Sequence, residues 1–265
     1  MSIMKEYLDY LRKKYETVDF IKDDPVQFLH SFKNDVKNLE IWGFIVSLFA
    51  FGKREAFIQK LNVLFEIMNH NPYEFILNFE KNESKLNGFI YRFYKDSDIK
   101  ALFFLLSEKL KKGMTLGDIF YEKRNNSTLE ILKGVYNEFE KSKYFTNSGG
   151  FSFMLSNPNK NGANKRLNMF LRWMARKGPV DLDLWHFIEP KNLIIPLDIH
   201  VGNISRKLNL LKRKQNDIKA ALELTEKLKE FDPNDPVSYD FALFGAGVNG
   251  FDVIKNENLG ILDKI

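Results

Sequence analysis

The sequence contains no cysteine. This absence excludes a disulfide, a cysteine-ligated zinc ion and an iron–sulfur cluster, and it is typical of a reducing compartment. We therefore expect a cytoplasmic protein that uses no cofactor. His200 has no acidic or cysteine companion at metal-ligand spacing, so it is interpreted as a structural histidine and no metal site is expected.

Long apolar runs are also lacking. The most apolar stretch, residues 41–51 (IWGFIVSLFAF), is about half of the roughly 20 residues that a membrane helix requires, so it predicts a buried core helix. The first residues, MSIMKEYLDYLRKKYE, are charged throughout, whereas a signal peptide needs an uninterrupted apolar stretch. We expect neither export nor a membrane partner.

What the chain does contain favours an all-α fold. Of its 265 residues 44% are hydrophobic and 14% aromatic, enough to bury a substantial core. Apolar residues alternate in the manner of a strand only at residues 193–195. Helical spacing recurs at residues 99–110, 129–139, 167–174 and 218–231.

Proline marks three helix starts, each after an Asp or Asn that can cap: Asp24-Pro25, Asn71-Pro72 and Asp235-Pro236. Gly245 is placed to end the last of these helices. The clearest loops, residues 146–164 and 178–196, divide the chain into an N-terminal helical half and a C-terminal helical third.

Positive charge is concentrated in one segment. Residues 160–214 contain twelve Lys and Arg against four acidic residues, a net charge of +8, whereas the whole chain carries +5. A solvated helix face is the alternative, and we favour it for a single run such as residues 211–214. For the whole segment we predict phosphate contact, and the expected nucleic-acid-binding residues are Lys160, Arg166, Arg172, Arg176, Arg206 and Lys207.

Lys165 is expected in the first turn of a helix capped by Asn164. The buried stripe of this helix is Leu167, Phe170, Leu171 and Met174, and its arginines lie largely off that stripe. The positive end of the helix dipole disfavours an ammonium in the first turn, and a lysine that loses its proton more easily is a better amine nucleophile. A solvated or phosphate-binding lysine is the alternative.

Asp198 is placed to cap a helix over residues 199–211, directly after the loop that Pro196 ends. Most aspartates in this position are structural caps only. Backbone N–H donors and the helix dipole also favour an ionised carboxylate, which can stabilise a developing cation. Both roles stay open for Asp198.

The string PLDIHV at residues 196–201, followed by Ile204, Arg206 and Leu208, resembles the aspartate-bearing motif of the helix-hairpin-helix, Gly-Pro-Asp superfamily of DNA glycosylases. Together with residues 165–185 and 235–245, it looks closer to a bacterial protein family of unknown function and of about this length, itself similar to a distant branch of that superfamily. The family likeness covers most of the chain, and the glycosylase likeness covers about residues 164–211.

This resemblance implies a two-lobed helical fold with a cleft between the lobes. The expected unit is residues 1–265, with a central lobe of residues 38–177 and a terminal lobe of residues 1–37 and 178–265. The resemblance also implies a DNA glycosylase with AP lyase activity on damaged bases, in which Lys165 attacks the sugar C1′ and Asp198 assists. The implied partner is DNA, with RNA also open, and the implied state is a monomer.

The sequence departs from the superfamily pattern in three features. The usual hairpin, with two glycines separated by one apolar residue, is missing from residues 157–164, which contain only Gly162. The interval from Lys165 to Asp198 is 33 residues, longer than in endonuclease III-like enzymes and similar to archaeal 8-oxoguanine glycosylases. The cysteine-bound cluster of endonuclease III is also absent, because the chain has no cysteine.

Two other functions remain open. The protein could be a non-catalytic binder of DNA or RNA on a glycosylase-like fold, or a helical adaptor that happens to be basic. Any enzyme of this type needs aromatic side chains to stack on or replace the extruded base. Trp42, Trp173 and Trp185 are candidates, but each is individually more typical of a core residue, so none is included among the expected site residues.

Overall fold

The computed structural model describes residues 3–249, and these residues form an all-α fold. Among them no strand is present; the β-type pairing consists of two isolated bridges, Tyr91 with Tyr94 and Gly162 with Asp217. The all-α prediction is confirmed, and residues 193–195 form no strand.

Helices follow one another through the chain, joined by loops of varied length. The first part contains α1 (Ile3–Tyr15), the 3-10 helices η1 (Phe20–Asp23) and η2 (Pro25–Phe32), α2 (Val36–Phe49), α3 (Arg54–Ile67), α4 (Pro72–Leu77), α5 (Phe79–Asn82), η3 (Glu83–Leu86), α6 (Asp96–Lys111), α7 (Leu116–Tyr121), α8 (Thr128–Glu140) and α9 (Gly149–Met154). The second part contains α10 (Lys165–Ala175), η4 (Pro190–Asn192), α11 (Ile199–Lys207), α12 (Ile218–Lys229), η5 (Pro236–Tyr239) and α13 (Asp240–Val248).

Helix α2 lies at the centre of the larger group of helices. It is apolar on almost every side because η2, α3, α4, α7 and α10 all pack around it. The predicted core helix is therefore confirmed, although it ends at Phe49 and leaves Phe51 in the following loop. No helix in the described part of the chain is long and apolar enough to cross a membrane.

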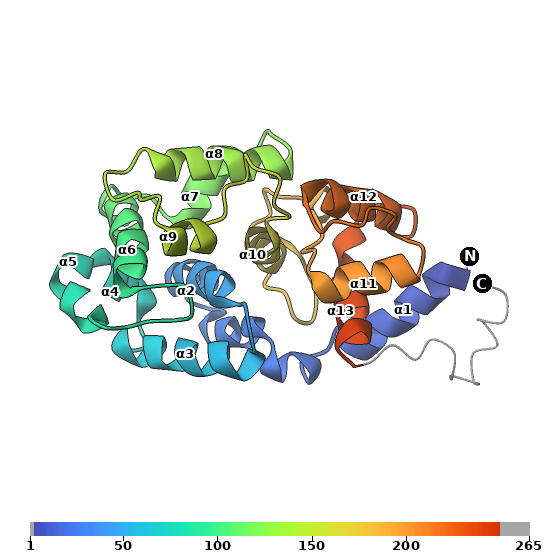
Figure 1. The fold of residues 1–265 in the computed structure, drawn as a ribbon, viewed down its shortest axis with the longest axis horizontal. Helices are drawn as coiled ribbons and strands as arrows, with labels where there is room; N and C mark the ends of the chain where they lie inside the picture. The colour runs from blue at the N-terminus through green and yellow to red at the C-terminus, as the bar shows by residue number, and fades with distance from the viewer. Residues whose placement is uncertain (1–2, 250–265) are drawn as a thin grey trace.

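The two ends of the described chain meet in a second group of helices. Helix α13 packs against both α1 and α11, and α12 packs against η5. Figure 1 shows α1, α11, α12 and α13 together at one end of the molecule, the helices α2 to α9 at the other, and α10 between them. The predicted lobe boundary before residue 38 falls within the first turn of α2 and assigns η2 to the other lobe, yet η2 and α2 pack together.

The predicted helix starts are confirmed at Pro25, Pro72 and Pro236, each at the first turn of its helix. The prediction for Gly245 is wrong, because this glycine lies inside α13. A Cβ at Gly245 would stand 2.3 Å from the ring of Tyr15 in α1. The glycine therefore allows α1 and α13 to approach each other closely.

The prediction that Arg172 and Arg176 bind nucleic acid is wrong, because both side chains are buried. Their side chains are 1% and 0% exposed, so neither can contact a phosphate. Arg172 pairs with Asp181 at 3.2 Å and with Asp240 at 2.5 Å, and Arg176 pairs with Asp181 at 2.7 Å. Arg176 also contacts Glu16 and Asp235. The two arginines join α10 to the terminal group of helices through buried ion pairs.

Candidate active site

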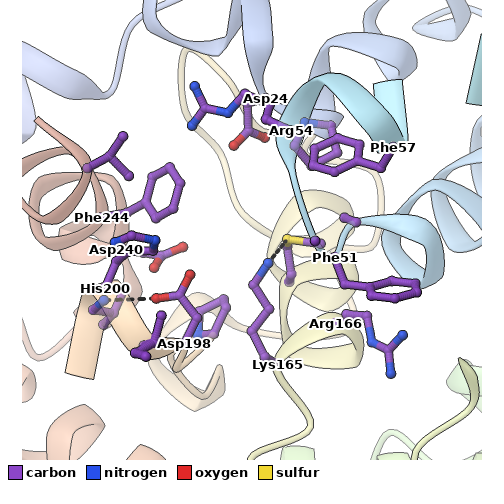
Figure 2. Close-up of a pocket in the computed structure, with 18 of the residues that line it drawn as sticks. Asp24, Phe51, Arg54, Phe57, Lys165, Arg166, Asp198, His200, Asp240 and Phe244 are labelled. Atoms are coloured by element: carbon purple, nitrogen blue, oxygen red, sulfur yellow. Dashed lines mark hydrogen bonds between the residues drawn. The ribbon is translucent and has the colours of Figure 1, made fainter. Parts of the chain in front are cut away.

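A cleft of about 660 Å³ lies where α10 faces the terminal helices. Its walls come from the start of η2, the loop before α3 and the first turn of α3, Phe153 of α9, one face of α10 along most of its length, the start of α11 and the inner face of α13. Lys165 and Asp198, far apart in sequence, both line this cleft, and Figure 2 shows them on facing sides of it.

Lys165 is the first residue of α10, as predicted. Asn164 holds the N-cap position in a left-handed conformation with φ of 51°, but its side chain accepts a hydrogen bond from Ser156 and donates one to the carbonyl of Gly162 instead of capping. The Nζ of Lys165 donates to the sulfur of Met169 at 3.2 Å. Within residues 3–249 Lys165 forms no ion pair, so its half-buried amine faces the cleft without a carboxylate bound to it.

Asp198 caps α11, as predicted. Its Oδ1 accepts a hydrogen bond from the backbone N–H of Val201 at 2.8 Å, and its side chain is half-buried at the cleft wall. Helix α11 ends at Lys207, four residues before the predicted end, because Asn209 takes a left-handed conformation with φ of 56°. The cap leaves the second carboxylate oxygen of Asp198 turned toward the cleft (Figure 2).

Asp240 is a third charged group in the cleft, and the sequence analysis missed it. Burial raises the pKa of Asp240 to about 6, although the Arg172 guanidinium opposes this shift. The charge of Asp198 raises the pKa of Asp240 further and that of Lys165 lowers it, so all three groups act on one another. One signal was available: Asp240 is the only charged residue in residues 236–249.

Asp24 is another charged group in the lining of the cleft. It caps η2 by accepting from the N–H of Val26 at 3.0 Å. Burial raises the pKa of Asp24, while that hydrogen bond and the charges of Lys165, Arg172 and Arg54 lower it. Lys165 therefore lies within electrostatic reach of both Asp24 and Asp240.

Aromatic rings form the apolar part of the cleft, and most of them are phenylalanines. Phe57, Phe51 and Phe244 line it together with Trp173. The Arg54 guanidinium lies 5.8 Å from the ring centre of Phe244, which connects α3 with α13 across the cleft. Trp42, Trp173 and Trp185 are all buried in the core, and of the three only Trp173 reaches the cleft wall.

The remaining predicted nucleic-acid residues are scattered. Arg166 lines the cleft, whereas Lys160 is exposed at a separate pocket of about 520 Å³. Arg206 donates to the carbonyl of Arg213 and to Asn216, and Lys207 beside it is exposed on α11. The cleft has two further cations outside the predicted basic segment, Lys53 and Arg54.

His200 lies at the cleft beside Asp198, with its ring 6.0 Å from that of Phe244. In the part of the chain that the structure describes, no group of three or more histidine and acidic side chains is placed to hold a metal ion. The chemistry available to this cleft therefore comes from two amines, four carboxylates, three guanidinium groups, one imidazole and a set of aromatic rings; the amines are Lys53 and Lys165, and the carboxylates are Asp24, Glu55, Asp198 and Asp240.

A match to a known protein family covers the residues that line the cleft. A family model described as "Protein of unknown function (DUF2400)" matches residues 24–249, which is most of the chain. The chain belongs to the DUF2400 family. The DUF2400 match begins at Asp24 and therefore includes Asp24, Lys165, Asp198 and Asp240. No curated protein and no solved structure matches the chain.

Proposed function

We propose that this protein is a DNA glycosylase with AP lyase activity, built as two helical lobes around the cleft. The observation that carries this proposal is the convergence of Lys165 and Asp198, 33 residues apart, on one cleft with cationic and aromatic walls. An amine nucleophile and a carboxylate on facing sides of a cavity are the groups that a covalent attack on a sugar requires.

The size and lining of the cleft fit an extruded nucleotide. A volume of about 660 Å³ is within the range of small-molecule sites. Phe51 and Phe244, which are only partly buried, offer faces for a base, and Lys53, Arg54 and Arg166 offer positive charge for the flanking phosphates. Removing a base from the stack is needed because the sugar C1′ is out of reach inside a duplex.

The residues of the cleft supply each step of the reaction. The neutral amine of Lys165 attacks C1′, and the bond from C1′ to the base breaks with its electron pair leaving on the base, which takes up a proton. Asp198 stabilises the positive charge that develops on the sugar and accepts the proton that the amine loses. The C1′–O4′ bond then breaks, O4′ takes up a proton and Nζ loses its remaining proton, which opens the sugar ring and leaves an imine between Nζ and C1′. The imine permits loss of a C2′ proton and release of the 3′ phosphate by β-elimination.

The experiment is borohydride trapping on duplexes that carry 8-oxoguanine, uracil or an abasic site. We expect a covalent adduct with the unmodified protein and none with Lys165→Gln. Lys160→Gln is the matched control, because Lys160 is an exposed lysine of the same basic segment outside the cleft. Asp198→Asn keeps a residue that can cap α11 but removes the charge, so we expect base release to slow by about a hundredfold or more.

A different result would favour the non-catalytic binder. Absence of an adduct and of base release across the whole lesion panel would refute the enzymatic proposal. A DNA affinity that falls as salt rises would then identify a binding protein, because phosphate contacts release counterions. An affinity insensitive to salt would leave neither proposal standing.

A further inference from the structure

A tight turn at the rim of the cleft carries two exposed side chains on a rigid base. Tyr91 and Tyr94 exchange backbone hydrogen bonds of 3.0 and 2.8 Å, which leaves Arg92 and Phe93 at the tip. Arg92 has a left-handed conformation with φ of 52°. Both tyrosines are buried; Tyr91 donates to the carbonyl of Phe51, and Tyr94 donates to that of Leu48 at 2.7 Å.

The tip of this turn belongs to a cluster of rings and guanidinium groups that we term the aromatic–arginine patch: Phe51, Arg92, Phe93, Phe153 and Arg166. Phe93 is 59% exposed and Phe153 is 41% exposed, a large apolar exposure for two phenylalanines in contact. Their ring centres are 5.2 Å apart, and the ring of Phe51 lies 5.0 Å from that of Phe153.

The two arginines give the patch its charge. The guanidinium of Arg92 lies 5.6 Å from the ring centres of both Phe51 and Phe93. The guanidinium of Arg166 lies 4.7 Å from the ring centre of Phe153 and is held by the carbonyls of Leu48 and Phe153. The patch therefore presents flat apolar faces next to two positive charges, of which that of Arg166 is held in place by the two carbonyls.

These features select one class of ligand. An unpaired nucleobase is planar and can stack on a phenylalanine or a guanidinium, and the phosphate attached to it is attracted to the arginines. Phe51, Phe153 and Arg166 also line the cleft, so a strand on the patch continues directly into it. An apolar protein segment would use the rings but not the two cations.

We propose that the aromatic–arginine patch binds unpaired nucleobases beside the cleft. This inference rests on the proposed function for its choice of nucleic acid, and it adds a preference for DNA whose bases are already unpaired. Stacking is tolerant of sequence, because every base has a flat face, so the preference does not depend on which bases are unpaired.

The test is fluorescence anisotropy with the full chain and three labelled probes of equal length: a paired duplex, the same duplex with a central three-base mismatch, and a single strand. We expect the unmodified protein to bind the mismatched duplex at least about fivefold more tightly than the paired one. Phe93→Ala and Phe153→Ala should both remove this preference, and Phe93→Ala, whose ring lies outside the cleft lining, should change affinity for the paired duplex by less than about twofold.

Tyr121→Ala is the matched control. Tyr121 is 46% exposed and has the Arg124 guanidinium 3.8 Å from its ring centre, but it lies outside the cleft. The control should bind all three probes as the unmodified protein does. Equal affinity of the unmodified protein for paired and mismatched duplexes would overturn the proposal. The proposal would also be overturned if Phe93→Ala lost affinity equally for both duplexes, or if Tyr121→Ala lost the mismatch preference as well. Either result would indicate a general or protein-binding surface.

The two proposals fail separately. If the mismatch preference is present but no borohydride adduct forms, the proposed lyase activity is refuted and the proposed base-binding patch is supported. If the adduct forms but the mismatch preference is absent, the patch is refuted and the lyase activity is supported. Because Phe93 and Phe153 are exposed, their alanine variants should keep the melting temperature of the unmodified protein, which circular dichroism can check.

Discussion

Replacing Arg176 by methionine should strongly destabilise the fold, because this side chain is the centre of a buried ion cluster. Its Nη1 contacts Glu16 and lies 2.7 Å from Asp181, and its Nε lies 2.7 Å from Asp235. Methionine fills much of the same space but leaves these carboxylates without their principal partner. Arg172 remains near Asp181, and Arg12 remains near Glu16.

The expected loss in the free energy of unfolding is about 3 to 5 kcal/mol at pH 7, the range for removing one partner of a buried ion pair. Arg213→Met is the matched control. Arg213 also pairs with one carboxylate, Asp217, but its side chain is 34% exposed. A solvent-exposed pair contributes little to stability, so the control should unfold almost as the unmodified protein does.

The loss in the free energy of unfolding caused by Arg176→Met should become smaller as the pH falls. Burial by itself would raise the pKa of Glu16, but hydrogen bonds from Arg176 and Arg12 lower it below its ordinary value. In the unmodified protein this carboxylate therefore contributes stability above its ordinary pKa of 4.5, and that contribution disappears at lower pH. In Arg176→Met the stranded carboxylates can be protonated, which favours the folded state as the pH falls.

Urea denaturation followed by circular dichroism at pH 7 and pH 4.5 measures both effects. A loss below about 1 kcal/mol at pH 7 would refute the buried-cluster interpretation of Arg176. A loss that stays the same at both pH values would show that the destabilisation comes from packing and not from stranded charge. DNA affinity of the folded variant should be unchanged, because Arg176 is inaccessible.

Two further predictions concern α13. Gly245→Ala should lower stability by about 1 to 3 kcal/mol, since the new Cβ would meet the ring of Tyr15, and a melting temperature equal to that of the unmodified protein would contradict this. Burial raises the pKa of Asp240 from 3.8 to about 6, so the stability from this carboxyl group is complete below about pH 4 and lost as the pH rises through 6. The stability of Asp240→Asn, which cannot titrate, should therefore improve relative to the unmodified protein by roughly 3 kcal/mol between pH 4 and pH 7, and a constant difference would contradict the raised pKa.

Local patterns in the sequence predicted the helical character of the chain and, among the cleft residues, Lys165, Arg166 and Asp198. The prolines at residues 25, 72 and 236 start helices because their fixed φ suits a first turn, and Lys165 and Asp198 occupy the expected helix positions. Asp24 and Asp240 were missed as site residues. Asp24 was missed because a helix-capping role alone explains its place in the sequence. Asp240 was missed because its place in the cleft depends on how α13 packs against α11.

The sequence by itself determined that the chain is helical, where five of its helices start, and that Lys165 and Asp198 stand at two of those starts. These are properties of neighbouring residues along one chain. Only the tertiary structure decided which arginines are exposed: Arg172 and Arg176 lie off the apolar stripe of α10, yet they are buried because Asp181, Asp235 and Asp240 meet them from elsewhere in the fold. Burial of a charge depends on partners brought together by packing, which the spacing of residues within one helix does not record.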